Sequence, residues 1–323
     1  DWLIRSEAEA KKDVRPSDAY FTKLDAVIEK NRDTDFGYYY ICDEPECRGI
    51  SPVYLKHIYD HVAEKDPYHP VLTASRGGKA YVGCADWFET HPYLGAKTLP
   101  DGTRTYWRNP NEMGDFVDAF ELADRPDKVV GFLPTCFASS WVSYPTFDEY
   151  VLHTWAAMMR GGKSLWPYAG HDMGDRPSIY EGTKYVFSSF AALEDLVLNG
   201  TRTTFARSKE LEGVLYALPD EKMLVAVNFT DRPRQVELPK TDGVFREFRG
   251  ERTFALSATA PVRLELAPLE TLVACTKAHD RGLRTLAETK ADIVRKDAER
   301  RGRDNQLRGR YGDVQVTSNV RMR

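Results

Sequence analysis

The stretch FGYYYICDEPE, residues 36–46, indicates the fold more directly than any other part of the sequence. Its aromatic and β-branched residues favour a strand, and Pro45 ends a strand because proline has no backbone N–H to donate. Three carboxylates, Asp43, Glu44 and Glu46, therefore stand directly behind the predicted strand. Such a cluster either caps the helix that follows or carries chemistry at the end of the strand.

Strand and helix patterns alternate through residues 1–200. Helical spacing of apolar residues is found at 17–32, 51–65, 115–123 and 146–162, and strand patterns are found at 36–42, 69–75, 81–94, 127–137 and 163–170. This alternation predicts parallel β/α architecture, in which functional residues gather at the carboxyl ends of the strands. The acidic cluster stands at such an end, as do ETHPYL at 89–94 and YAGHDMGD at 168–175.

The pattern changes after Gly200. Residues 201–276 alternate apolar and polar side chains with turn signals between the runs, which predicts a small antiparallel β-sandwich. Residues 277–323 begin with a highly charged helical pattern, which we interpret as a linker that leads into the start of a further domain. Residues 1–200 then form the β/α domain.

Composition excludes several kinds of partner. Thirteen basic and seven acidic residues from Lys277 onward give that part of the chain a charge of +6, which leaves −10 for the rest and −4 overall. A mild net charge gives no reason to expect a nucleic-acid partner, and no apolar run approaches the ~20 residues of a membrane span. The five cysteines are odd in number and scattered, so we expect neither a disulfide framework nor a zinc site.

The run YYYICDEPE resembles the fourth strand of clan-A-like (β/α)8 glycoside hydrolases. That strand commonly ends in Asn-Glu-Pro with the glutamate as acid/base, and Asp43, Glu44 and Pro45 occupy the motif here. ETHPYL is similar to the His-x-Tyr at the sixth strand of such enzymes. Residues 144–170 look like the seventh helix and eighth strand of bacterial polysaccharide-degrading relatives, which also commonly have a β-sandwich after the barrel.

The resemblance implies an α/β fold, the C-terminal portion of a (β/α)8 TIM barrel followed by a small antiparallel β-sandwich. It implies a glycoside hydrolase that cleaves a polysaccharide or oligosaccharide without a cofactor or metal, in a secreted, periplasmic or cell-surface location. Only five barrel strands are present, and five cannot close an eight-stranded barrel. We therefore expect an upstream segment or another chain to supply the missing barrel strands.

The predicted seventh barrel strand, VVGFLPTCFASS at 129–140, departs from the family pattern. It holds no carboxylate where a retaining clan-A enzyme keeps its nucleophile. This departure favours a second interpretation, a non-catalytic carbohydrate-binding barrel. A third interpretation, a structural segment of a multidomain surface protein, is compatible with a C-terminal segment that looks like the interrupted start of another domain. Turnover of a glycan distinguishes the hydrolase from both.

Glycoside cleavage needs one carboxyl group that is protonated and another that is ionised. Glu44 suits the first role, because neighbouring carboxylates and a partly buried barrel mouth both raise a pKa. For the second role we rank Glu89 first and Asp86 next, with Asp172 and Asp175 as further candidates. The substrate-binding residues expected at the same strand ends are Asp43, Glu46, Trp87, His91, Tyr93, Trp141, Tyr168 and Asp172. The alternative for each of these residues is a purely structural role.

Overall fold

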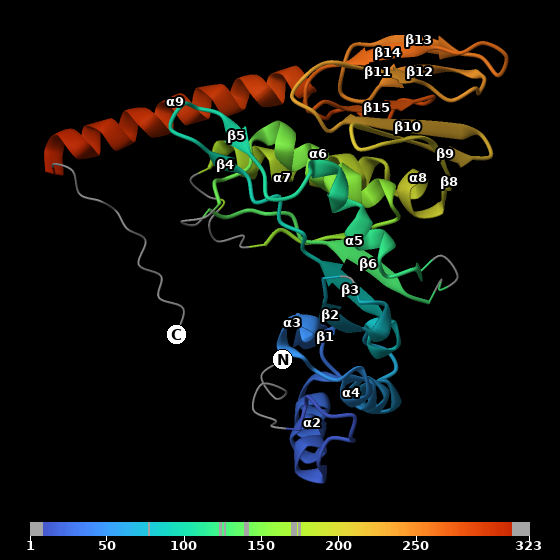
Figure 1. The fold of residues 1–323 in the computed structure, drawn as a ribbon, viewed down its shortest axis with the longest axis vertical. Coiled ribbons are helices and arrows are strands. Elements are labelled where there is room, and N and C mark those ends of the chain that lie inside the picture. The colour runs from blue at the N-terminus through green and yellow to red at the C-terminus, as the bar shows by residue number, and fades with distance from the viewer. Residues whose placement is uncertain are drawn as a thin grey trace.

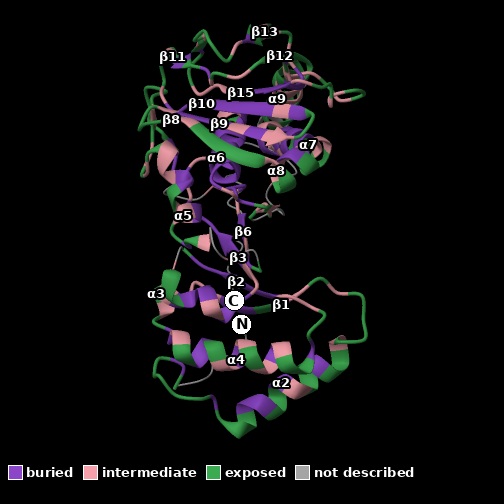
Figure 2. Ribbon diagram, turned by 90° about the vertical axis from the view of Figure 1, so that its right-hand side faces the viewer, coloured by how far each residue is buried: buried purple, intermediate pink, exposed green. Residues whose placement is uncertain are grey.

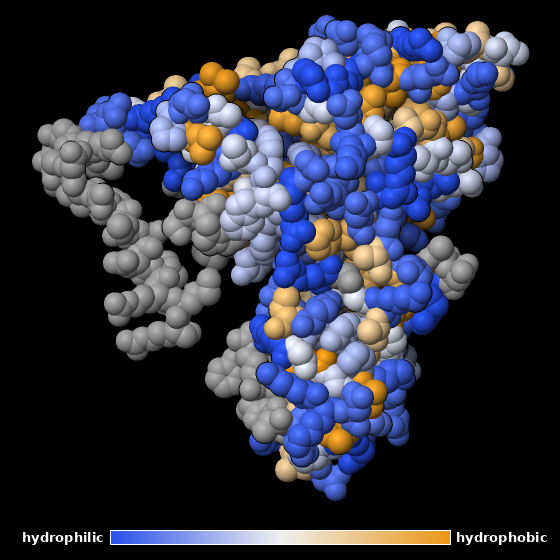
Figure 3. All heavy atoms as spheres, in the orientation of Figure 1, coloured by the Kyte–Doolittle hydropathy of each residue, from blue (hydrophilic) through white to orange (hydrophobic). Residues whose placement is uncertain are grey.

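The computed structural model describes residues 9–76, 78–122, 125, 127–138, 142–168, 173 and 176–311. It contains a parallel sheet flanked by helices, an antiparallel β-sandwich and a long C-terminal helix (Figure 1). Hydrophilic residues cover most of the face seen in Figure 3, with apolar residues scattered among them. Of the helices formed by the described residues, none has the length and apolar character needed to cross a membrane.

Five parallel strands form the first sheet. They are β1 (Tyr39–Asp43), β2 (Val71–Ala74), β3 (Trp87–Thr90), β6 (Val129–Phe132) and β7 (Ser164–Leu165), and they pair in that order. Parallel strands in sequential order are the arrangement of a (β/α)8 barrel, so the parallel architecture predicted for residues 36–168 is confirmed. β1 and β7 form the two edges of the sheet, and no strand of the described residues pairs with the outer side of either.

Seven α-helices belong to this part of the described chain. They are α2 (Asp18–Asn31), α3 (Pro45–Arg48), α4 (Pro52–Lys65), α5 (Asp115–Asp118), α6 (Phe147–Met159), α7 (Pro177–Ala192) and α8 (Glu194–Asn199). α2 and α4 share a core with β1, and α5 and α6 contact β6, whereas α7 packs on α6 and α8 packs on the β-sandwich. α4 begins as the sequence predicts, because Ser51 Oγ accepts hydrogen bonds from backbone N–H groups of the first turn. Its Leu55, Ile58 and Val62 recur at helical spacing and are buried in one core with β1 and β2 (Figure 2).

Two elements differ from the sequence-based prediction. The strand predicted at 81–94 begins instead as the 3-10 helix η1 (Lys79–Cys84), because Tyr81 is buried against α4, and β3 follows only after it. The helix predicted at 115–123 is reduced to the single turn α5, because Glu121 has a left-handed φ of 52° that an α-helix does not accommodate. The long connection from β3 to α5 also contains β4 (Lys97–Thr98), β5 (Arg104–Thr105) and a second 3-10 helix, η2 (Pro110–Met113).

Helix α6 lies between the parallel sheet and the β-sandwich (Figures 1 and 2). A capping box starts it: Thr146 Oγ1 accepts from the Glu149 N–H at 3.2 Å, and the Glu149 carboxylate accepts from the Thr146 N–H at 2.8 Å. Nearly all of its residues are buried, because α6 contacts β6 on one side and β10 and β15 of the sandwich on the other. Its polar residues Glu149, His153 and Thr154 are buried as well, and each makes hydrogen bonds.

Eight antiparallel strands form the β-sandwich. They are β8 (Thr201–Arg207), β9 (Leu211–Leu218), β10 (Glu221–Asn228), β11 (Arg234–Glu237), β12 (Gly243–Glu247), β13 (Thr253–Leu256), β14 (Arg263–Leu266) and β15 (Thr271–Cys275). One sheet has the order β13-β12-β15-β10-β9-β8, and β11 pairs with β14 in the other. Leu224 and Ala226 of β10 are buried against this second sheet, whereas Val225 and Val227 are buried against α6. Both faces of the central strand are therefore covered, and the predicted antiparallel strands are observed.

The charged helix α9 (Leu286–Tyr311) differs from the predicted linker, because its first half is fixed to the β/α part of the chain. Glu181 of α7 is fully buried, and its carboxylate pairs with Lys296 of α9 at 2.6 Å and with Arg284 just before the helix. Beyond this contact α9 continues past the β4–β5 hairpin (Figure 1). The start of a further domain, predicted near the C-terminus, falls on residues 312–323, which lie outside the described residues.

Candidate active site

Glu44 stands at the carboxyl end of β1, where the chain turns into α3. Its backbone N–H donates to the Ala74 carbonyl at 2.8 Å, which ties it to the end of β2. Pro45 begins α3, and Glu44 before it has a left-handed backbone with φ 48° and ψ 57°. Residues other than glycine rarely adopt this conformation, and those that do are concentrated at functional sites. The Glu44 side chain is 34% exposed, so its carboxylate is accessible at the strand end that the sequence indicates.

His91, the residue after β3, holds the Glu44 carboxylate. Its Nε2 lies 2.8 Å from Glu44 Oε1, while its Nδ1 is buried and has no hydrogen-bond partner among the described residues. We therefore assign the proton to Nε2, since a proton on Nδ1 would be buried without an acceptor. His153 Nε2 of α6 donates to the Pro92 carbonyl at 3.0 Å and so fixes the loop that follows His91. Burial lowers the pKa of His153 to about 4, which keeps this ring neutral.

Three aromatic rings stand beside this pair. The Tyr93 ring centroid lies 5.6 Å from that of His91, 6.0 Å from that of Tyr168 and 5.2 Å from that of Phe137. Burial, followed by the neighbouring Tyr168 and Glu44, raises the pKa of the Tyr93 phenol. Tyr168 is 43% exposed. The group therefore presents an aromatic surface to solvent next to a carboxylate.

Arg76, the second residue after β2, brings a positive charge to the same edge of the sheet. Its Nη1 donates to Cys47 Sγ at 3.4 Å, and this bond, followed by the charges of Glu44 and Glu46, raises the pKa of the Arg76 guanidinium. Glu46 accepts a hydrogen bond from Ser75 Oγ through Oε1, and its Oε2 is buried without a hydrogen-bond partner among the described residues. The sequence-based prediction missed Arg76, whose only signal is its position directly behind the strand pattern at 69–75.

Asp43, the last residue of β1, is held by neighbours in the sequence. Its Oδ2 lies 2.6 Å from Arg48 Nη2, and its Oδ1 accepts from the Tyr40 hydroxyl at 3.0 Å. The carboxylate is close enough to Tyr93 to contribute to the raised pKa of that phenol. The predicted site residues that the structure brings together at this edge are Asp43, Glu44, Glu46, His91, Tyr93 and Tyr168.

Glu89 is enclosed within the sheet instead of being exposed at its edge. It is only 2% exposed, and it accepts a hydrogen bond from Ser164 Oγ, which in turn accepts from Trp87 Nε1 at 3.0 Å. Gly131 of β6 provides the room, since a Cβ at that position would collide with the Glu89 carboxyl group and with Ser164 Oγ. Burial raises the pKa of Glu89 to about 7. A sugar ring cannot touch Glu89 in this conformation.

Asp86 and Trp87 lie at the amino end of β3, opposite the edge that carries the acidic cluster. Asp86 Oδ1 accepts from the Tyr59 hydroxyl at 2.6 Å and lies 3.3 Å from Lys128 Nζ. The Trp87 ring lies 6.3 Å from that of Trp166. The strand predicted at 81–94 would place both residues within it, but the observed β3 begins only at Trp87. Asp86 and Trp87 therefore lie at its amino end and do not reach the predicted site.

Three predicted residues, Trp141, Asp172 and Asp175, lie outside the described residues. Trp141 follows β6 in the sequence, and the two aspartates follow β7. Loops that leave the carboxyl ends of parallel strands meet at one edge of a sheet. The roles assigned to these three residues stay predictions.

The structure is similar to solved glycoside hydrolases. A GH27 β-L-arabinopyranosidase from Geobacillus stearothermophilus, in complex with arabinose, matches with a TM-score of 0.55 and 11% identity over 80% of this chain and 61% of that chain. An α-amylase from Geobacillus thermoleovorans, complexed with acarbose, matches with a TM-score of 0.53 and 14% identity over 80% and 64%. An Anoxybacillus α-amylase matches with a TM-score of 0.51 and 10% identity over 80% and 63%. No protein-family model and no curated protein matches this chain.

These similarities establish the fold. It is the C-terminal portion of a (β/α)8 barrel followed by an antiparallel β-sandwich, as in glycoside hydrolases, and the predicted fold class is confirmed. The chain spans less than two thirds of the length of each of these three proteins. The same fold hosts many functions, so the similarity does not by itself assign an activity or a substrate to this chain.

Proposed function

We propose that this chain carries the acid/base residue of a glycoside hydrolase that cleaves a polysaccharide or oligosaccharide. The observation that supports this most directly is the position of Glu44. An accessible carboxylate with a left-handed backbone stands at the carboxyl end of a parallel strand, hydrogen-bonded to His91. In β/α barrels this edge of the sheet holds the catalytic groups.

Glu44 acts as the general acid in this proposal. Its protonated carboxyl group donates a proton to the glycosidic oxygen while the bond from that oxygen to the anomeric carbon breaks. The second carboxylate acts on the opposite face of the sugar, where it either forms the new bond to the anomeric carbon itself or takes a proton from the water that forms it. His91 Nε2–H donates to Oε1 and so fixes the orientation of the carboxyl group. The other carboxyl oxygen makes no hydrogen bond with a described residue, which leaves it to face the sugar.

The aromatic rings of Tyr93, Phe137 and Tyr168 form one wall of the proposed site. The C–H faces of sugar rings pack against aromatic rings, and a tyrosine hydroxyl at the edge of such a ring hydrogen-bonds sugar hydroxyls. Arg76, whose guanidinium is close enough to Glu44 for that charge to raise its pKa, supplies further donors to the same region. These side chains come from the ends of four different strands, so the barrel sheet and not a single loop positions the sugar.

The second carboxylate of the reaction is proposed to be Asp172, ahead of Glu89. Glu89 is enclosed and its pKa is raised to about 7, so the group is neither accessible nor fully ionised at neutral pH. Asp172 follows β7 in the sequence, and the residues that follow the strands of β/α barrels commonly supply the catalytic groups. Loss of turnover in Asp172→Asn with retained turnover in Glu89→Gln supports this order, and the reverse result contradicts it.

We further propose that parallel strands from an upstream segment or another chain pair with the open edges of β1 and β7. Tyr40 on β1 and Trp166 directly after β7 are 40% and 39% exposed, and a closed barrel buries aromatic surface at such positions. Hydrogen exchange of the β1 amides should slow when the upstream segment or the second chain is present. Unchanged exchange in both cases contradicts the proposal.

A non-catalytic carbohydrate-binding barrel is the second candidate function. The observation that favours it is the end of β6, since residues 129–140 contain no carboxylate. Both candidates predict glycan binding, but only the hydrolase releases new reducing ends. A purely structural segment predicts neither binding nor release.

The test measures binding and reducing-end release with a panel of polysaccharides, using the protein with its barrel completed. Wild type and Glu44→Gln are compared side by side, because glutamine keeps the shape of the side chain but has no proton to donate. Release by wild type and little release by a variant that still binds support the hydrolase. Binding without release by either protein supports the binding barrel and contradicts the hydrolase.

A further inference from the structure

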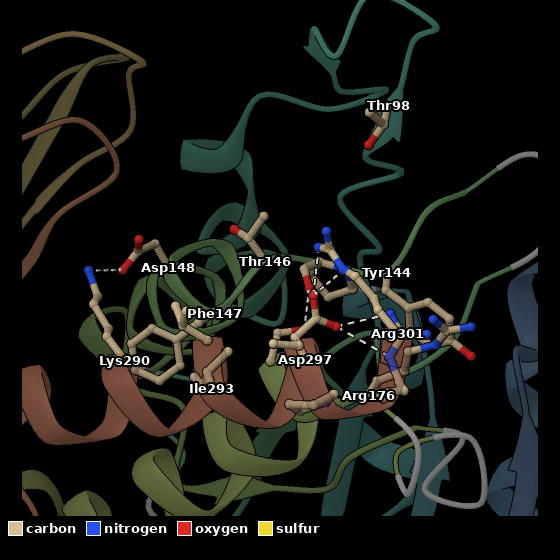
Figure 4. Close-up of a pocket in the computed structure, with 16 residues that line it drawn as sticks. Thr98, Tyr144, Thr146, Phe147, Asp148, Arg176, Lys290, Ile293, Asp297 and Arg301 are labelled. Atoms are coloured by element: carbon tan, nitrogen blue, oxygen red, sulfur yellow. Dashed lines mark hydrogen bonds and ion pairs between the residues drawn. The ribbon is translucent and has the colours of Figure 1, made fainter. Parts of the chain in front are cut away.

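A second candidate binding site lies between α9 and the loops that follow β3, β6 and β7 (Figure 4). The structure contains a cavity of about 870 Å³ there. None of the residues that we predict for the active site lines it. The lining residues that matter here are Tyr144, Phe147, Arg176, Lys290, Ile293 and Arg301.

One part of the cavity is apolar. Phe147, Ile293 and Val294 line it, and Val294 is 71% exposed to solvent. Val294 stands on a helix whose exposed positions are otherwise mostly charged. Of these three side chains Phe147 is buried, Ile293 is partly buried and only Val294 is exposed, so together they offer an apolar wall that a ligand can cover.

The other part of the cavity carries excess positive charge. Four basic and two acidic residues line the whole cavity. Lys290 pairs with Asp148 at 2.7 Å, and Arg300 and Arg301 both pair with Asp297 at 2.9 and 2.6 Å (Figure 4). Arg300 also pairs at 3.0 Å with Asp304, which does not line the cavity. The Arg301 side chain is 73% exposed, so its guanidinium can turn toward a ligand. The charge balance therefore favours an anion.

The loops that line this cavity also leave the edge of the sheet that carries Glu44. Tyr144 lies in the loop after β6 and Arg176 in the loop after β7, and the Arg176 guanidinium lies over the Tyr144 ring at 4.6 Å from its centroid. Thr98 of β4 lies in the loop after β3. The proposed active site and this cavity are therefore bordered by loops that follow the same three strands, β3, β6 and β7.

We propose that this cavity binds a uronic acid residue of an acidic oligosaccharide. This inference rests on the proposed function and names the class of its substrate. The C–H face of the sugar packs against Phe147 and Ile293, and its carboxylate accepts paired hydrogen bonds from Arg301, whose planar guanidinium matches a carboxylate. A neutral sugar satisfies only the apolar part.

The experiment measures equilibrium binding of tetragalacturonic acid and of its methyl ester by calorimetry, in a Glu44→Gln background so that no substrate is consumed. Arg301→Gln removes the proposed carboxylate partner. Arg303→Gln is the matched control, because Arg303 is an exposed arginine on the same helix that does not line the cavity. Thermal unfolding of both variants checks that the fold is retained.

The acid should bind about tenfold more weakly to Arg301→Gln than to Arg303→Gln, which is the usual size for one charge-assisted hydrogen-bonded pair. The methyl ester should bind to the Arg303→Gln control about tenfold more weakly than the acid does, and Arg301→Gln should change its affinity little. Raised salt should weaken binding of the acid but not of the ester. Equal affinity for acid and ester, or equal losses in the two variants, overturns the inference. Tighter Arg301-dependent binding of oligoglutamate than of tetragalacturonic acid also overturns it, because the site would then recognise an acidic peptide.

Arg301-dependent binding without turnover by the wild type leaves this inference standing and refutes only the proposed catalysis.

Discussion

Replacing Glu89 by glutamine is expected to stabilise the protein at alkaline pH. Burial raises the pKa of Glu89 from 4.5 to about 7. Between these two values the folded protein holds a proton that the unfolded chain has released, so the stability of the folded state falls as pH rises. The favourable contribution is complete below the unfolded pKa and is lost as pH passes through the folded pKa. Glutamine has no proton to lose and is free of this penalty.

The expected size follows from the pKa difference and the local contacts. At about 1.36 kcal/mol per pKa unit, the penalty above pH 8 amounts to about 3 kcal/mol. Glutamine fits the site as the protonated glutamate does, because its carbonyl oxygen can accept the hydrogen bond from Ser164 Oγ. Its amide group takes the place of Oε2, which has no hydrogen-bond partner among the described residues. Stability near the unfolded pKa should therefore change little.

Urea denaturation of wild type and Glu89→Gln at a series of pH values measures this directly. The difference between the two free energies of unfolding isolates Glu89, because groups that titrate in both proteins cancel when they lie apart from the substitution. The difference should grow between about pH 5 and pH 8 in favour of the variant. A difference that stays constant over this range refutes the argument that burial holds the Glu89 proton.

Two further substitutions test the packing described above. Gly131→Ala should cost about 1–3 kcal/mol of stability in thermal unfolding, because the new methyl group collides with Ser164 Oγ, whereas Gly37→Ala, with open space around it, should not show this loss. An equal effect at both glycines contradicts the collision. Glu181→Gln should lower stability by about 1–3 kcal/mol and make α9 more sensitive to proteolysis, because it removes the buried carboxylate that holds Arg284. Unchanged proteolysis of α9 argues that other contacts hold the helix.

Local sequence signals predict much of the fold and the principal site residue. Ser51 and Thr146 begin helices by accepting hydrogen bonds from the first turn, so the residues that mark each helix start lie next to one another in the sequence. The strand end at Pro45 is equally local, and it places Glu44 at the correct edge of the sheet. Hydrophobic patterns of period two identify the strands of the sandwich, although they do not show that both faces of β10 are covered.

Features that depend on distant residues could not be predicted in this way. Glu89 is enclosed because Gly131 and Ser164, which are far from it in sequence, lie on the neighbouring strands. Lys296 reaches Glu181 across more than a hundred residues, so α9 looks like a free charged helix in the sequence alone. The start of β3 was misplaced because Tyr81, an apolar residue typical of a strand, is buried in a 3-10 helix.

The central claim is that Glu44 donates a proton to the leaving group, and one kinetic comparison tests it most directly. Turnover by wild type and Glu44→Gln is measured with an unactivated oligosaccharide and with an aryl glycoside whose phenolate leaves without protonation, using the protein with its barrel completed. General acid catalysis is typically worth ~10²- to 10⁴-fold, so the variant should lose about that factor on the oligosaccharide and much less on the aryl glycoside. Full activity of Glu44→Gln on the oligosaccharide, or an equal loss on both substrates, contradicts the claim.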